Sequence, residues 1–292
     1  MSISDCKKTP VFINPESGSA DNIMNLLKQD DRLEIHATSA LQMADEIRKF
    51  VEAGEERILV SGGDGTLALA GGVLAGTATA LGVIPGGTLN HFAGRMGIPV
   101  DPKEAVELAL SGAPQAVNVA YVNDRLFINT SSVGAYVQFV RTRKHLEQRM
   151  NYHLASLLAG IRRLLRLSSA RIQLDDQLIR TPLVFIGVGE RELGFPSLGK
   201  NRPDGENALH LIAIRSHNPW ETLKLAFNAM LRGIDPLSRE GQVEHYTTDT
   251  VELYYRRKKR HIHVAVDGEL TLMQSPLRYR YAKDGLRVIL PA

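Results

Sequence analysis

The feature that most restricts the fold of this chain is a repeated junction between an apolar segment and a glycine-bearing loop. Residues 62–66 read Gly-Gly-Asp-Gly-Thr and follow the apolar segment 57–61, while residues 85–90 read Pro-Gly-Gly-Thr-Leu-Asn and follow the apolar segment 80–84. A third polar stretch, residues 14–18, follows the first apolar segment of the chain. In an open α/β fold such junctions gather at the carboxyl edge of a parallel sheet, where ligands bind. The pattern therefore predicts a parallel sheet flanked by helices, with a ligand site at that edge.

The two halves of the chain differ in pattern. In the first third, short apolar runs alternate with helical periodicity, as where Leu41, Ala44, Ile47 and Val51 recur at spacings of three and four. From about residue 117 the pattern changes to short strands with turns, interrupted by one helical stretch at residues 136–167. We therefore predict an α/β domain over residues 1–118 and a β-rich domain over residues 119–281, with residues 282–292 packing back on the first. The expected strands are 11–14, 33–37, 57–61, 80–84, 116–122, 126–130, 171–174, 183–188, 209–214, 250–255 and 261–266, and the expected helices are 20–29, the helix around 41–51 and 67–74.

Composition bounds the setting of the protein. The chain has 292 residues, and 35 lysines and arginines against 32 acidic residues leave a net charge of only +3, so attraction to anions has to come from local clusters. The single cysteine, Cys6, excludes an intrachain disulfide and favours a reducing compartment. No apolar run approaches the roughly 20 residues that span a bilayer, and residues 1–10 lack the apolar core of a signal peptide. These features predict a cytoplasmic protein.

The loop at residues 62–66 carries the strongest chemical signal. Adjacent glycines let the backbone approach a ligand closely, so that several N–H groups converge on phosphate oxygens. A bare carboxylate repels phosphate, so Asp64 in the middle of such a loop favours a bound Mg²⁺ between the two. The alternative is an ordinary tight turn. Neither common nucleotide fingerprint, Gly-x-Gly-x-x-Gly or Gly-x-x-x-x-Gly-Lys-Ser/Thr, occurs in the chain.

Together these segments resemble a known family. Residues 62–66 and 85–90, followed by Phe92-Ala93 and Gly97-Ile98-Pro99, are similar to the signature of the diacylglycerol kinase catalytic domain, and Asn14-Pro15-x-Ser17-Gly18 resembles that family's opening motif. The resemblance implies a Rossmann-like or phosphofructokinase-like nucleotide-binding domain at residues 1–118, a β-rich sandwich domain for a lipid substrate at residues 119–281, and Mg·ATP as phosphate donor. The positions that match nucleotide-binding positions of such kinases are Asn14, Ser17, Gly18, Thr38, Gly62, Gly63, Asp64, Gly65, Thr66, Gly87 and Thr88. For Thr38 a helix N-cap is an equal alternative.

The same resemblance suggests a general base. Residues 267–269 read Asp-Gly-Glu and match the family motif whose glutamate is the proposed base, which makes Glu269 the candidate catalytic base and Asp267 a supporting residue. Taken alone, an Asp-Gly pair between two strands is more often a plain turn. Many bacterial members hold a structural magnesium with an Asp-Asp-Gly-Leu-Leu-Asp-like segment. The corresponding segment here has altered spacing and ends in His210, which leaves Asp204 as a weak candidate ligand.

Two basic segments suggest how a lipid would be reached. Residues 256–260 read Arg-Arg-Lys-Lys-Arg, and residues 136–167 combine arginines with a leucine-rich stripe. We expect them to contact anionic headgroups, which would bring the protein to the inner face of the membrane as a peripheral protein. The alternatives are a solvated hairpin tip and a helix that covers the core. No nucleic-acid-binding motif is present, and an exposed sheet edge leaves a homodimer open.

The predicted function is an ATP-dependent lipid kinase, with the lipid undetermined. One alternative is a kinase of a soluble substrate, because NAD kinases share a Gly-Gly-Asp-Gly-like loop. The other is a nucleotide-binding regulator that has lost turnover.

Overall fold

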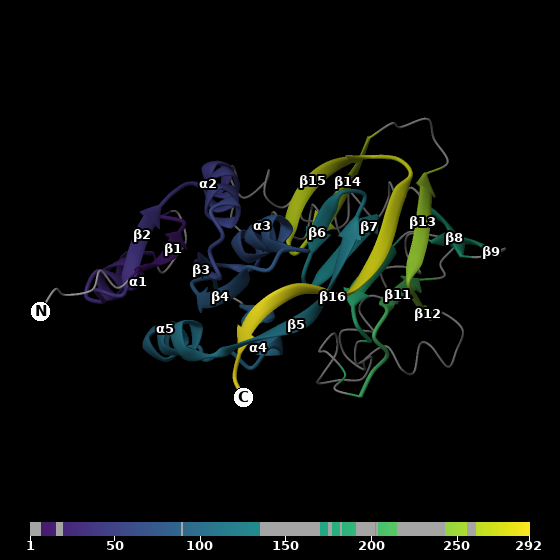
Figure 1. The fold of residues 1–292 in the computed structure, drawn as a ribbon. Helices are drawn as coiled ribbons and strands as arrows, with labels where there is room; N and C mark the ends of the chain where they lie inside the picture. Colours follow the sequence, from purple (N-terminus) through teal and green to yellow (C-terminus); the bar gives the residue numbers. More distant parts are fainter. Residues whose placement is uncertain are drawn as a thin grey trace, which may run out of the picture. The chain divides into compact units, whose positions relative to one another are not determined.

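The structure, a computed structural model, describes residues 7–15, 20–88, 90–134, 170–174, 177–181, 183–190, 202, 204–214, 243–255 and 261–292. The chain divides into two compact units. Unit 1 consists of residues 1–119 and 282–292, and unit 2 of residues 120–281. The chain leaves unit 1 within strand β5 (Ala113–Val122) and returns within strand β16 (Leu277–Leu290) (Figure 1).

Unit 1 is built on a parallel sheet. Its strands follow the order β2-β1-β3-β4, and the end of β16 joins the edge at β4 with Val288 opposite Leu81. Every residue of β4 is buried, as is usual for a strand covered on both faces. Because the strands are parallel, the segments that follow β1, β3 and β4 leave from the same edge. The strands are β1 (Thr9–Ile13), β2 (Leu33–Ala37), β3 (Arg57–Gly62) and β4 (Ala80–Pro85).

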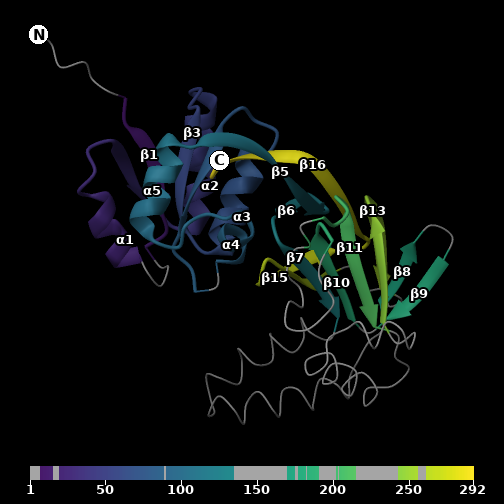
Figure 2. The ribbon, with the colours of Figure 1, turned by 90° about the horizontal axis from the view of Figure 1, so that it is seen from below.

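Helices cover both faces of this sheet (Figure 2). Helices α1 (Ala20–Leu27) and α5 (Pro102–Ser111) share a buried apolar cluster with Val11, Leu59 and Ile84 on one face. On the other face Phe12 packs edge-on against Phe50 of α2 (Ala40–Glu52), which contacts α3 (Asp64–Leu74). A short helix, α4 (His91–Arg95), follows the loop after β4.

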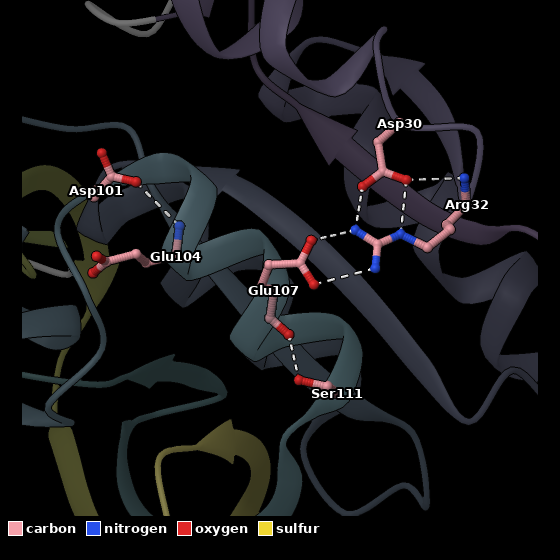
Figure 3. A network of polar contacts seen from close by, with 6 residues as sticks. All are labelled: Asp30, Arg32, Asp101, Glu104, Glu107 and Ser111. Carbon is pink, nitrogen blue, oxygen red and sulfur yellow. Dashed lines mark hydrogen bonds and ion pairs between the residues drawn. The ribbon is translucent and has the colours of Figure 1, made fainter.

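A charged cluster joins the turn before β2 to α5 (Figure 3). The guanidinium of Arg32 donates from Nε to Asp30 Oδ1 at 2.9 Å and from Nη2 to Asp30 Oδ2 at 2.7 Å. It also donates to both carboxylate oxygens of Glu107 on α5, at 3.2 Å from Nη1 to Oε2. This arginine lowers the pKa values of both Asp30 and Glu107, chiefly through these hydrogen bonds.

Unit 2 is a two-layer β structure around one apolar core. The first layer is an antiparallel sheet in the order β12-β11-β10-β7-β14-β15, and the second contains the start of β16 with β13, β8 and β9 and the β5–β6 hairpin. Residues of both layers form a single buried cluster, in which the rings of Phe127 and Tyr279 meet edge to face at 6.1 Å. The strands are β6 (Arg125–Phe127), β7 (Thr130–Gly134), β8 (Ala170–Leu174), β9 (Gln177–Thr181), β10 (Leu183–Val188), β11 (Leu209–Ile214), β12 (Val243–Thr248), β13 (Thr250–Tyr255), β14 (His261–Val266) and β15 (Glu269–Gln274).

The predicted fold class, a parallel α/β sheet together with a β-rich sandwich, is confirmed. Several elements were not predicted, namely α4, α5, β7, β9, β12, β15 and β16. The predicted start of the third helix at Leu67 is wrong, because α3 begins at Asp64 and so includes residues 64–66 of the glycine loop. The helical stretch predicted at 136–167 lies outside the described residues.

Candidate functional site

The β3–α3 junction places the glycine loop at a helix N-terminus. Gly63 occupies the N-cap position with extended backbone (φ −84°, ψ 178°), and the first intrahelical bond runs from Leu67 N to Gly63 O at 3.0 Å. Asp64, Gly65 and Thr66 therefore form the first turn, in which backbone N–H groups have no carbonyl acceptor within the helix. Such a turn carries partial positive charge and suits an anion such as phosphate.

The loops after β3 and β4 touch through their backbones. A Cβ atom on Gly87 would lie 2.6 Å from Gly63 Cα, and one on Gly86 would lie 3.2 Å from Gly62 N. Gly86 N also donates to Gly62 O at 3.0 Å. Gly87 leaves no room for a side chain, whereas a side chain at Gly86 would require its neighbours to shift by a few tenths of an ångström. Gly62, Gly63 and Gly87, predicted from separate motifs, are thus brought together.

Asp64 holds these two loops in register. Its Oδ1 accepts a hydrogen bond from Phe92 N at 2.8 Å and its Oδ2 one from His91 N at 3.1 Å, so the carboxylate caps the start of α4. Asn90, in the left-handed region at φ 47°, accepts from Gly87 N at 2.9 Å through its side-chain oxygen. The linking role of Asp64 was not predicted. The magnesium contact predicted for Asp64 stays a prediction.

Two further predicted residues lie after β1 and β2. Asn14 N donates to Ser61 O at a long 3.5 Å, next to the glycine loop. Thr38 is buried, its N–H donates to Ile13 O at 3.1 Å, and its hydroxyl donates to Glu46 on α2 at 3.3 Å. The N-cap position of α2 belongs to Ser39 rather than Thr38, so the structure gives no support to a capping role for Thr38.

The remaining predicted nucleotide residues divide into two groups. Thr88 is exposed in the loop after β4, where a ligand at the sheet edge can reach it. Ser17 and Gly18 lie outside the described residues.

The carboxyl edge of the unit 1 sheet fits a phosphorylated ligand. Besides the helix N-terminus and the glycine loops, it holds the hydroxyl of Ser61, which is fully buried and has no hydrogen-bond partner in the described part of the chain. A buried polar atom without a partner is costly and is normally satisfied by water or a ligand. Within the same described residues no group of three or more metal-ligating side chains occurs.

In unit 2, the turn between β14 and β15 carries the second predicted motif. Asp267 and Gly268 both have positive φ, 46° and 84°. The Asp267 carboxylate accepts three backbone N–H groups, from Ile128 at 2.8 Å, Asn129 at 2.8 Å and Thr130 at 2.9 Å. Asp267 thereby fastens the turn to the segment that connects β6 to β7.

Glu269 follows this turn as the first residue of the edge strand β15. Its side chain is 56% exposed, and Oε2 accepts a hydrogen bond from Arg125 Nη2 at 2.9 Å. An exposed carboxylate can accept a proton from a bound hydroxyl if the hydroxyl comes within hydrogen-bonding distance. Arg125 was missed, because nothing in the sequence connects residues that lie 144 positions apart.

The segment around Asp204 is organised by a glutamate. Glu190 accepts from Arg202 Nη1 at 2.8 Å and from Glu206 N at 3.0 Å, and these contacts lower its pKa, the Glu206 amide having the larger effect. Asp204 itself is exposed, and His210, in place of the family's last aspartate, is buried beside His245. Among the described residues around Asp204, no three metal-ligating side chains come together, and the weak prediction of Asp204 as a ligand is not tested.

The loops of unit 1 lie in a segment that matches a known protein family. The model of the diacylglycerol kinase catalytic domain matches residues 8–122, which contain the loops after β1, β3 and β4. Residues 8–122 are therefore similar to the diacylglycerol kinase catalytic domain family. The resemblance stated from the three N-terminal motifs is thereby confirmed, while the Asp267–Glu269 turn lies beyond the matched segment.

Curated relatives agree with this family. A protein of Chromohalobacter salexigens named "Probable lipid kinase YegS-like" is 39% identical over 99 residues, which cover 32% of each chain. One of the same name from Pseudomonas syringae pv. tomato is 33% identical over 167 residues, covering 55% of this chain and 52% of the relative. The chain thus spans between a third and a half of these relatives' length.

Solved structures extend the similarity of fold. The crystal structure of a diacylglycerol kinase from Bacillus anthracis str. Sterne superposes with a TM-score of 0.66 at 21% identity, covering 99% of this chain and 98% of the other. At that identity the likeness shows a shared fold over nearly the whole chain.

The predictions of membrane contact are not tested by the structure. The basic segment 256–260 and the arginine- and leucine-rich segment 136–167 lie outside the described residues. Among the helices that are described, none combines the length and apolar character needed to cross a bilayer.

Proposed function

We propose that this protein is a lipid kinase that transfers the γ-phosphate of Mg·ATP to a hydroxyl group of a membrane lipid. The observation that carries the proposal is the contact between the glycine loops after β3 and β4 in unit 1. Their backbones meet beside the N-terminus of α3, and both loops lie in the segment that matches the diacylglycerol kinase catalytic domain. The lipid acceptor is suggested by the relatives, which are named as probable lipid kinases.

The nucleotide would be held by residues of unit 1. Its phosphates would accept N–H groups from the first turn of α3, where Gly65 and Thr66 precede the first intrahelical donor. The close contact of Gly63 with Gly87 would keep the two loops together beside those phosphates, and Asp64 would hold the loop after β4 and lie near Mg²⁺. When bound, Mg²⁺ supplies charge neutralisation on the phosphate oxygens.

The acceptor hydroxyl requires a base, which we assign to Glu269. Its carboxylate is exposed at the start of an edge strand, and the turn before it is fixed by the three N–H groups that Asp267 accepts. A carboxylate fixed in this way loses little conformational entropy when it meets a substrate hydroxyl. Asp267 is accordingly a supporting residue that sets the position of the base.

The test is incubation of the purified protein with γ-labelled ATP, Mg²⁺ and mixed micelles of diacylglycerol, phosphatidylglycerol, a sphingoid base or an isoprenoid alcohol. We expect label in the organic phase with at least one lipid, and at least about 100-fold slower labelling with Glu269→Gln. The matched control is Glu252→Gln, since Glu252 is also an exposed glutamate of unit 2 paired with an arginine, at 2.8 Å. This control should retain activity.

Two other outcomes would contradict the proposal. Label that appears only in a water-soluble product would favour a kinase of a soluble substrate. Measurable ATP binding without any labelled product would favour a nucleotide-binding regulator.

A further inference from the structure

The contact between Arg125 and Glu269 joins two distant parts of unit 2. Arg125 is the first residue of β6, directly after the β5–β6 turn, and Glu269 is the first residue of β15. Nη2 of the arginine donates to Oε2 of the glutamate at 2.9 Å, and the two side chains are 40% and 56% exposed.

The backbone around this contact is fixed by other bonds. Before β15, Asp267 accepts three N–H groups from the connection that follows β6, and Asp267 N donates to Thr130 O at 2.8 Å. At the far end of β15, the side-chain nitrogen of Asn123, in the β5–β6 turn, donates to Gln274 O at 3.1 Å. The edge strand is therefore tied to the β5–β6 hairpin and its outgoing connection at both ends, and the separation of Arg125 from Glu269 is set by the backbone.

The contact engages only one side of the carboxylate. Nη2 meets Oε2, and in the part of the chain that the structure describes Glu269 has no second side-chain partner. Oε1 keeps its lone pairs, so the pair leaves one oxygen for the proton of an acceptor. A guanidinium is always charged and donates along fixed directions, which suits it to orienting a carboxylate.

We propose that Arg125 is a positioning residue that orients the carboxylate of Glu269 for proton acceptance. This inference rests on the proposed function, in which Glu269 is the base. Exposed ion pairs contribute little to folding stability. Removing Arg125 should therefore change turnover while leaving thermal unfolding nearly unchanged.

The experiment measures kcat and KM for wild type, Arg125→Met, Arg125→Lys, Glu269→Gln and the double variant Arg125→Met/Glu269→Gln, using the lipid that accepts label. We expect Arg125→Met to lower kcat about 100-fold, as for a misplaced catalytic group, with the KM for ATP unchanged within about twofold. Arg125→Lys should recover part of the loss. The double variant should be no slower than Glu269→Gln, because the arginine acts only through the glutamate.

The matched control is Arg278→Met, which removes the arginine of another exposed Arg–Glu pair in unit 2, 2.8 Å from Glu252 and with 70% of its own side chain exposed. It should leave kcat unchanged.

The outcomes separate the two proposals. Full activity of Arg125→Met beside an inactive Glu269→Gln would overturn the role of Arg125 and leave the proposed function standing. An equal further loss of activity when Arg125→Met is added to Glu269→Gln would also overturn it. No labelled lipid from the wild type, or full activity of Glu269→Gln, would overturn the assignment of the base, and the role of Arg125 with it.

Discussion

Two aspartates show how a single side chain can fix the backbone around a site. Asp64 accepts the N–H groups of His91 and Phe92, and Asp267 accepts those of residues 128–130. In both cases an ionised acceptor receives backbone donors from a neighbouring loop, an arrangement that makes comparatively strong hydrogen bonds. Both residues were predicted from their motifs as functional, and the structure adds a positional role to each.

Substitution of Asp267 should be costly. Alanine would leave three N–H groups without their acceptor and would occupy a backbone conformation with φ at 46°, so we expect Asp267→Ala to lower the free energy of unfolding by about 3 kcal/mol. Asp267→Asn should cost less, because asparagine tolerates positive φ and keeps one acceptor oxygen. Urea unfolding measures both.

The control for Asp267 is Asp124→Ala in the exposed β5–β6 turn, which should stay within about 0.5 kcal/mol of wild type. Equal stability of Asp267→Ala and Asp124→Ala would show that the three bonds do not hold the turn.

Asp64 should affect stability and nucleotide binding together. Asp64→Ala removes two amide contacts and should lower the free energy of unfolding by about 2 kcal/mol. It should also weaken ATP binding, because the loops after β3 and β4 lose their link. Calorimetric titration with ATP and thermal unfolding check the two effects, with Asp45→Ala on the exposed face of α2 as control. Unchanged ATP affinity in Asp64→Ala would contradict the assignment.

For single residues, the sequence could predict which side chains belong to a functional motif, but not which groups form hydrogen bonds with them. Asp64 and Glu269 were predicted from local patterns, but their partners come from contacts across 27, 28 and 144 positions. The donors to Asp64 are main-chain N–H groups, which carry no residue-specific signal. Arg125 has no local pattern that separates it from any other exposed arginine.

At the scale of elements, the contact between the loops after β3 and β4 is the most specific feature of unit 1. A methyl group on Gly87 would lie 2.6 Å from Gly63 Cα, so Gly87→Ala should push the loops apart and weaken ATP binding at least about tenfold, by misplacing the phosphate-binding groups. Gly94→Ala on α4 is the matched control, because its added Cβ would meet nothing within 4 Å. Equal ATP affinity in the two variants would mean that the loop contact is not needed for binding.

The elements that could be predicted are those with an unbroken pattern. β4 and β10 are short apolar runs, and their predicted ranges match closely. The predicted start of α3 lies three residues after its observed start at Asp64. Gly65 caused this error, because glycine is a poor helix former. The missed α5 has a readable start, since Asp101 caps it and Pro102 stands at its first position.

The missed strands have weaker patterns. β16 runs over 14 residues with several charged ones, and β15 is an edge strand whose side chains are mostly part-exposed or exposed. Strand pairing, rather than local composition, defines such segments.

At the scale of the whole molecule, we expect the cluster of Arg32, Asp30 and Glu107 to make the stability of the protein depend on pH (Figure 3). The pKa values of Asp30 and Glu107 lie below their ordinary values of 3.8 and 4.5, because Arg32 donates to both carboxylates. Groups whose pKa is lowered on folding contribute stability above their ordinary pKa, and this contribution is lost as the pH falls through the lowered values. Arg32→Met should therefore reduce Tm at pH 7, and the difference from wild type should shrink as the pH falls below about 4.5 and further below about 3.8.

Salt provides the control for the Arg32 prediction. The three side chains are partly exposed, so 1 M NaCl should reduce the Tm difference between Arg32→Met and wild type at pH 7. A difference that is the same at all pH values and salt concentrations would indicate lost packing rather than lost charge.

The division of the chain into an α/β half and a β-rich half follows from the change of pattern near residue 117. Parallel strands separated by helices and strands separated by turns have different periodicities, which a sequence displays. The order of strands in unit 2 does not follow from the sequence, since β7 pairs with β10 and β14, which are far from it along the chain. The functions assigned to the two domains remain proposals.

We propose that unit 1 binds ATP and that Glu269 accepts the proton of the lipid hydroxyl. The most direct measurement compares ATP affinity and single-turnover transfer of labelled phosphate to lipid in wild type and Glu269→Gln. We predict equal ATP affinity within about twofold and a transfer rate at least about 100-fold lower in the variant. Equal transfer rates would contradict the account, and so would loss of ATP binding in Glu269→Gln.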